Sequence, residues 1–175
     1  MPLFTFPIAP FALYDGELAA NGTVVVTPNT CLYVGCVLQV PAVLTGVRVN
    51  WNTAGNGNYD VGIYDATGTS PFTGAPGNLL AHSGAIITAA NAQTPALVGG
   101  NLNLSPGRYW LALWAANALD KFVRAVGLGS TDIVLSNVNT GGPLPATAAA
   151  ASGGAPTDAG VSKPILIGIL QGGWS

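Results

Sequence analysis

Apolar and polar side chains alternate along much of this 175-residue chain, with the two-residue period that is typical of β-strands. In residues 43–51 the odd positions are Val, Thr, Val, Val and Trp, whereas Arg48 lies on the intervening face. We therefore expect a half-buried strand whose odd positions face the core. The loop sequence AGNGN follows, and a second alternating run occupies residues 59–64 before a DATG turn.

Further runs of strand length continue this pattern, and no convincing amphipathic helix is present. They span residues 23–27, 32–40, 79–82, 85–88, 97–104, 108–115, 122–126 and 133–138. Turn signals recur about every 8–12 residues, as in sandwiches and barrels. Strands this short need two packed sheets to bury their apolar faces. The sequence thus predicts an all-β fold, an antiparallel β-sandwich of the jelly-roll kind with extended N- and C-terminal arms.

Composition divides the chain into four segments. Residues 1–22 form an apolar arm, and residues 23–138 form the β-sandwich domain. Residues 139–162 are a loop or arm rich in Gly, Pro and Ala, and residues 163–175 contain a C-terminal strand. Because residues 139–162 hold three prolines and almost no large side chain, we expect this segment to contribute little to a core.

Both ends of the chain are apolar and are expected to contact other subunits. The C-terminal strand is apolar on both faces, so it either returns to its own sheet or adds to the sheet of a neighbouring subunit. The N-terminal arm is broken by prolines, yet it is too apolar to lie free in water. The expected subunit-interface residues are Phe4, Phe6, Ile8, Phe11, Ile165, Ile167, Ile169 and Trp174.

The segment RYWLALWA presents two different faces. Leu111 and Leu113 are expected to face the core, which leaves Trp110 and Trp114 on the opposite face, about 13 Å apart. Such a pair can stack on sugar rings, or it can be covered by the arms or by another subunit. We favour a covered face, because the chain supplies apolar arms that need a partner. The residues to test for carbohydrate binding are Trp110, Trp114, Tyr64 and Trp51.

Charged side chains are scarce, at 7% of the chain against about a quarter in ordinary soluble domains. So little charge favours a protein that is covered by partners over a free monomer. The net charge of −2 and the lack of a basic stripe argue against nucleic acid as a partner. The proline-broken N-terminus predicts neither a signal peptide nor a membrane-spanning helix, so we expect synthesis in the cytoplasm followed by assembly.

The sequence predicts no catalytic residue, no cofactor and no metal site. His82 has no titratable neighbour in the sequence and no Gly-x-Ser-x-Gly motif presents a nucleophile, so His82 is expected to be a surface or turn residue. Asp65 in YDATGTS is expected to cap its own turn. Cys31 and Cys36 lie on opposite faces of one predicted strand, so they cannot bond to each other and are expected to be buried thiols.

Three motifs carry a resemblance to a known group of proteins. A strand that ends in VGIYDATG is followed by the loop APGNLLAHSG and then by the strand LSPGRYWLALW, all within residues 23–126. In this order the motifs resemble the jelly-roll or β-sandwich domains of the virion proteins of tailed bacteriophages. Each motif joins a turn to a buried aromatic or aliphatic residue, so the resemblance bears on the fold more than on a role.

Domains of this kind occur in capsid cement (decoration) proteins, head fibres and tail-fibre modules. The resemblance implies a structural, non-enzymatic protein of the virion that lies on the capsid surface. Its partners would be the major capsid protein and copies of itself, as a homotrimer. A cement protein suits a small sandwich with two apolar arms. The alternative is a head-fibre or tail-fibre module that binds carbohydrate on the host surface.

Overall fold

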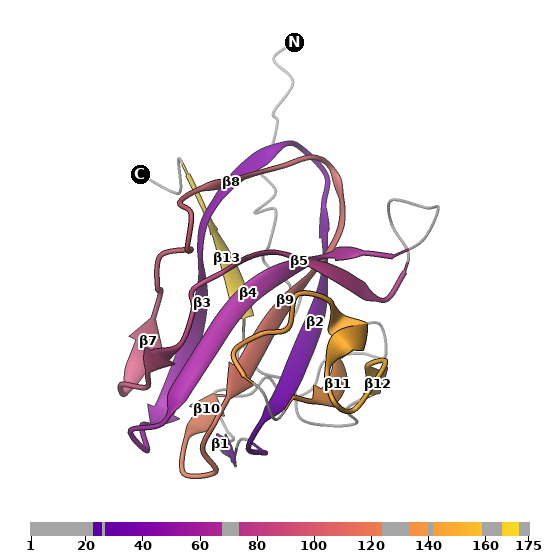
Figure 1. The fold of residues 1–175 in the computed structure, drawn as a ribbon. Helices are drawn as coiled ribbons and strands as arrows, with labels where there is room; N and C mark the ends of the chain where they lie inside the picture. The colour runs from indigo at the N-terminus through magenta and orange to yellow at the C-terminus, as the bar shows by residue number, and fades with distance from the viewer. Residues whose placement is uncertain are drawn as a thin grey trace.

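The computed structural model describes residues 23–25, 27–67, 74–123, 134–139, 142–158 and 166–171. Within these ranges the strands form two sheets that pack against each other, and all their pairings are antiparallel (Figure 1). The antiparallel β-sandwich expected from the alternation is therefore confirmed, whereas the jelly-roll strand order stays a prediction. In the described part of the chain, no helix is long and apolar enough to span a membrane.

Sheet A is built around one long strand, β3. It follows the order β1-β10-β3-β13, and β7 and β8 also pair with β3. Val49 of β3 pairs with both Leu166 of β13 and Gln93 of β7, so these two strands lie on opposite sides of β3. The strands are β1 (Thr23–Val25), β3 (Ala42–Thr53), β7 (Asn91–Gln93), β8 (Leu102–Leu104), β10 (Lys121–Val123) and β13 (Leu166–Leu170).

Sheet B carries the two longest strand pairings of the fold. Its order is β12-β11-β2-β9-β4-β5, and β6 pairs with the start of β4. Strand β9 lies in the middle of the sheet, where it pairs with β2 on one side and with β4 on the other. The strands are β2 (Thr30–Leu38), β4 (Asn58–Ala66), β5 (Pro76–His82), β6 (Ile86–Ile87), β9 (Gly107–Ala115), β11 (Val134–Val138) and β12 (Thr157–Asp158).

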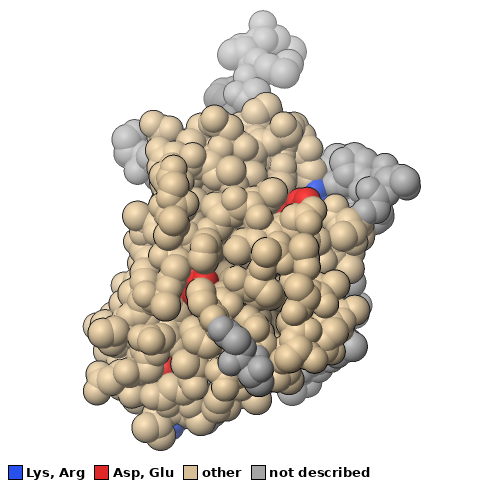
Figure 2. All heavy atoms as spheres, in the orientation of Figure 1, with Lys and Arg blue, Asp and Glu red and all other residues tan. Residues whose placement is uncertain are grey.

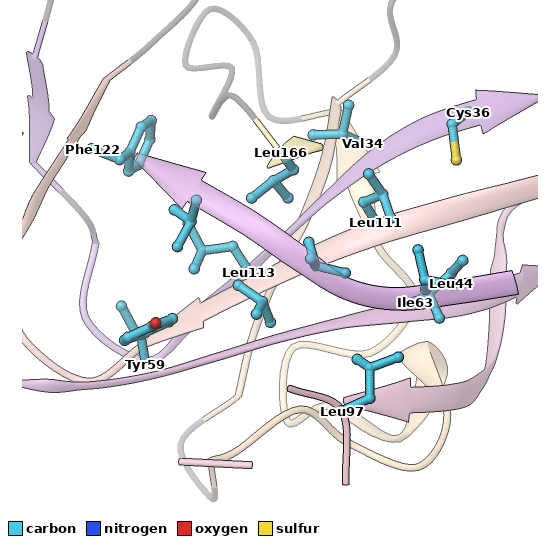
Figure 3. Close-up of a cluster of buried hydrophobic side chains, with 14 of the residues drawn as sticks. Val34, Cys36, Leu44, Tyr59, Ile63, Leu97, Leu111, Leu113, Phe122 and Leu166 are labelled. Carbon is cyan, nitrogen blue, oxygen red and sulfur yellow. The ribbon is translucent and has the colours of Figure 1, made fainter. Parts of the chain in front are cut away.

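The main core lies between the two sheets, and Figure 3 shows part of it. Leu111 and Leu113 of β9 point into this core, as the alternation predicted. Trp51 of sheet A meets Tyr59 of sheet B edge to face, with ring centroids 5.2 Å apart. Aromatic pairs in this arrangement gain about 0.5–1.5 kcal/mol beyond the burial of their area.

The start of β3 departs from the predicted pattern. Leu44 is buried and Val43 is only partly buried, whereas the alternation placed Val43 inside and Leu44 outside. The pairing with β13 passes from Gly46 directly to Leu44, so Thr45 is the extra residue of a β-bulge. A bulge shifts the side-chain alternation by one position. The prediction was therefore right from Val47 to Trp51 and wrong before the bulge.

The other predicted strands agree with the structure to within a few residues, with three exceptions. The run at residues 97–104 forms only the short strand β8, and the short strands β7 and β12 were not predicted. The sequence left open whether the C-terminal strand returns to its own sheet or adds to the sheet of a neighbouring subunit. Strand β13 returns to its own sheet, where Leu166 is fully buried against the core.

Candidate functional site

The outer face of sheet B carries a second cluster of buried side chains. Its members come from β2, β4, β9 and the segment after β11, and they are Cys31, Tyr33, Tyr64, Trp110, Ala112, Trp114, Leu144 and Ala148. Trp110 and Trp114 share this face, as the alternation predicted, but they are only 1% and 6% exposed. Both tryptophans of this strand are therefore interior, whereas Tyr109 on the other face is only partly buried.

Residues 142–151, which we call the covering segment, lie over this aromatic face (orange in Figure 1, with the 3₁₀ turn η1, Ala148–Ala150). Leu144 and Ala148 supply its buried apolar contacts. Gly142 lies flat on the indole of Trp114, where an added Cβ would come within 2.0 Å of a ring atom. Only glycine allows this approach. The expectation that the segment contributes little to a core was wrong for these residues.

The polar atoms of the aromatic side chains are also occupied from within the chain. Trp114 Nε1 donates to the carbonyl of Asn139 (3.2 Å), and the Tyr64 hydroxyl donates to the carbonyl of Pro145 (2.6 Å). Trp110 Nε1 donates to the carbonyl of Gly74 (3.2 Å). A sugar platform needs open ring faces and free hydrogen-bonding groups. In this chain the ring faces are covered by other side chains, and the polar atoms are hydrogen-bonded to the backbone.

Tyr64 and Trp51, the other residues suggested for carbohydrate binding, are buried as well. Tyr64 is 0% exposed and Trp51 is 1% exposed, the latter inside the main core. The guanidinium of Arg108 stacks on Trp110 with its Cζ 4.7 Å from the ring centroid. Among the described residues, no tryptophan or tyrosine named in the sequence analysis presents a face to solvent.

A buried carboxylate ties the covering segment to sheet B. Asp60 of β4 is 0% exposed, and its Oδ2 accepts from Nδ1 of His82 (2.7 Å) and from the backbone N–H of Leu144 (3.0 Å). Its Oδ1 accepts from the hydroxyl of Ser83 (3.0 Å). A buried charge is tolerated when hydrogen bonds satisfy it in this way. Asp60 thus joins β4, β5 and the covering segment.

This arrangement includes Asp, His and Ser, but it is not a catalytic triad. In a triad the serine hydroxyl faces the imidazole and the carboxylate holds the imidazole from its other side. Here Ser83 faces Asp60 instead, and no other hydroxyl or thiol is hydrogen-bonded to His82 within the described ranges. The His82 side chain is 29% exposed, so its expected place at the surface is only partly right.

No sequence pattern indicated the contact between Asp60 and His82. The two residues are 22 positions apart, and the antiparallel pairing of β4 with β5 brings them together, because Gly62 lies opposite His82. Asp65 has a partner that the sequence did not suggest, because it accepts from the backbone and side-chain N–H groups of Asn78 in β5 (2.5 and 3.0 Å). The turn that Asp65 was expected to cap continues into residues 68–73, which lie outside the described part of the chain, so that cap stays a prediction.

Another buried carboxylate lies at the end of the sandwich beside the AGNGN loop. Asp120 is 0% exposed, and its Oδ1 accepts from the N–H of Gly55 (2.5 Å) and from the hydroxyl of Thr88 (2.8 Å). This contact fixes the loop against the start of β10. Across the described residues, no group of three or more His, Cys, Asp and Glu side chains is placed to hold a metal ion.

The two cysteines are free and buried, as the sequence predicted. Cys31 belongs to the outer aromatic cluster and Cys36 to the main core, so they lie on opposite faces of β2. Burial raises the pKa of Cys31 to about 11 and that of Cys36 to about 12. Both side chains are therefore neutral thiols at physiological pH and are poor nucleophiles.

Most of the predicted subunit-interface residues lie outside the described part of the chain. These are Phe4, Phe6, Ile8, Phe11, Ile165 and Trp174. Ile167 and Ile169 are described and lie on β13. Both are partly buried on the outer side of sheet A, opposite Arg48 and Gly46 of β3.

No protein family, curated protein or solved structure matches this chain. The resemblance to phage virion domains therefore rests on the sequence motifs alone.

Proposed function

We propose that this protein is a structural, non-enzymatic component of a virion, and specifically a capsid cement (decoration) protein. The observation that carries the proposal is the near absence of charge on its described surface. Asp60 and Asp120 are both fully buried, where they hold segments of the fold together. The face in Figure 2 shows only small areas of Asp, Glu, Lys and Arg. A surface of this kind favours permanent contact with other proteins.

Apolar side chains on the described surface support the same proposal. Ile87, Val98 and Leu119 are 65%, 63% and 67% exposed. Single exposed apolar residues are common, but here few charges separate them. On a capsid lattice such side chains would be buried against the major capsid protein. Each Å² of apolar surface removed from water stabilises the assembly by about 25 cal/mol.

The fold suits a structural component of a shell, which must resist mechanical strain and need not catalyse a reaction. The covering segment gives sheet B a second apolar layer, so β9 is packed on both faces. Close packing makes protein interiors hard to compress and lets them transmit force. We propose that the chain bridges neighbouring capsid subunits and stabilises the shell by adding interface. The homotrimer expected from the resemblance stays a prediction.

The test is binding to capsids that lack this protein. We expect the full chain to sediment with them, and a chain without residues 1–12 to bind with much lower occupancy while it melts at the same temperature. Removal of residues 163–175 is not a useful variant, because it deletes β13 and exposes the core around Leu166.

Salt concentration separates this mode of binding from an electrostatic one. Because the described surface has few charges, occupancy should change little between about 0.1 and 1 M NaCl, where the screening length falls from about 10 to 3 Å. Full occupancy of the shortened chain, or failure of the full chain to bind, would contradict the proposed function.

A further inference from the structure

Among the described strands, β13 is the last strand at one end of sheet A. On one side it pairs with β3 over all five of its residues. Within the described ranges, no strand pairs with its other side. The backbone groups along a free sheet edge are ready to pair with another extended chain.

The other sheet ends have features that prevent such pairing. The outer side of β5 is bridged by residues 146 and 147, through the backbone contact of Asn78 with Thr147 and the hydrogen bond from Leu79 N–H to the carbonyl of Ala146 (2.8 Å). At the opposite end of sheet B, β12 has only two residues, and β1 in sheet A has three. By contrast, β13 has five residues and carries neither charge nor proline.

The sequence of β13 identifies the strand that fits it best. It reads Leu-Ile-Gly-Ile-Leu from residue 166 to residue 170, which is the same in both directions. When two such strands pair antiparallel about Gly168, Leu166 lies opposite Leu170 and Ile167 lies opposite Ile169. In a two-fold interface a residue i that meets residue j is matched by j meeting i, and here the two opposed side chains are also of the same type at every position.

We propose that β13 pairs antiparallel with β13 of a second copy of this chain, so that sheet A continues across a two-fold axis at Gly168. The pairing would bring Ile167 and Ile169 of both copies together on the outer side of the joined sheet. These side chains are partly exposed in the single chain, so association would remove further apolar surface from water. The absence of charge in the strand means that no like charges oppose each other.

The first test is the solution mass of the full chain as a function of concentration, by light scattering and sedimentation. We expect Ile169→Lys to halve the mass and to raise the dissociation constant by about tenfold or more, because it places a charge opposite an isoleucine. The matched control is Ile87→Lys, which makes the same change at a 65% exposed position on sheet B and should leave the mass unchanged.

A second test examines the register of the pairing between the two β13 strands. It does not use Ile169→Lys, so it is informative even when that variant fails to fold. The Cα atoms of opposed residues in antiparallel strands lie about 4.5–5.5 Å apart, which is within the Cα–Cα range for a disulfide. An oxidised mixture of the Ile167→Cys and Ile169→Cys variants should therefore form covalent dimers, whereas either variant alone should form few.

Three results would overturn the pairing. They are a monomer at every concentration, an assembly whose mass Ile169→Lys leaves unchanged, and cross-linking within a single cysteine variant as efficient as in the mixture. The pairing does not require the proposed capsid role. If the chain dimerises as described but does not bind capsids, the proposed pairing is supported and only the proposed function is contradicted.

Discussion

Asp60 shows how one buried side chain organises three parts of the fold. It accepts hydrogen bonds from His82, Ser83 and the backbone of Leu144, and none of these contacts is local in sequence. Its role depends on buried oxygen atoms that accept these hydrogen bonds. A negative charge is not needed for this, since every partner is a hydrogen-bond donor.

Two substitutions of Asp60 should therefore differ in their effect on the free energy of unfolding. Asp60→Ala should lower the free energy of unfolding by about 2–4 kcal/mol, because it leaves the Leu144 N–H and Nδ1 of His82 without their acceptor. Asp60→Asn should lower it by less than about 1.5 kcal/mol, because the amide oxygen can accept from His82 and Leu144. The amide N–H would then donate to Ser83, whose hydroxyl has the carbonyl of Gly84 3.0 Å away as another acceptor.

Urea unfolding of both variants at neutral pH measures the difference. Equal losses for Asn and Ala would show that the charge itself matters, which would contradict the structural role assigned to Asp60.

The covering segment, like the short strands β7 and β12, was not predicted from sequence patterns. Strands β3, β4 and β9 were predicted from the alternation of side-chain types in their sequences, although in the structure β4 and β9 are buried on both faces over most of their length. The covering segment has no period, and Leu144 is its single large apolar side chain. It packs through glycine, alanine and backbone carbonyls, which also occur in exposed loops. The aromatic face was thus predicted correctly, but the segment that covers it was not.

Two tyrosines provide a matched test of how the covering segment is held. Both are 0% exposed, but the Tyr64 hydroxyl donates to Pro145 of the segment, whereas the Tyr59 hydroxyl has no hydrogen-bond partner among the described residues. Tyr64→Phe should lower the free energy of unfolding by about 1 kcal/mol, because it removes the hydrogen bond to the partly buried carbonyl of Pro145. Tyr59→Phe should leave it unchanged or raise it, because it removes an unpaired polar atom.

Chemical denaturation of both variants gives the comparison. A larger loss for Tyr59→Phe than for Tyr64→Phe would show that the covering segment does not depend on this hydrogen bond.

At the scale of the whole molecule, burial affects ionisable groups on both faces of sheet B. It raises the pKa of Cys31 on the outer face and of Cys36 on the inner face from 9.0 to about 11 and about 12, and it raises the pKa of Tyr59 to about 12. In the unfolded chain these groups ionise near their ordinary pKa values. The unfolded chain therefore loses protons at a lower pH than the folded one.

The stability of the protein should consequently decrease in alkaline solution. Below about pH 9 the free energy of unfolding should not depend on these groups, because they are protonated in both states. Between about pH 9 and 11 it should fall, with each thiol contributing up to about 1.4 kcal/mol per pH unit. Urea unfolding at several pH values measures this slope, and the double variant Cys31→Ala/Cys36→Ala should show a shallower one. An equal slope in both proteins would contradict the assignment to the thiols.

The long strand β3 also determines when the fold can be completed during synthesis. Its partners β7, β8, β10 and β13 all follow it in the chain, and the contact between Thr45 and Ile169 spans 124 positions. At about 5–20 residues per second, the ribosome needs about 6–25 seconds to make that stretch. Until β13 emerges, the side of β3 that it covers is open to other chains. We therefore expect a nascent chain of this protein to depend on a chaperone that keeps its apolar strands from pairing with other chains until β13 is made.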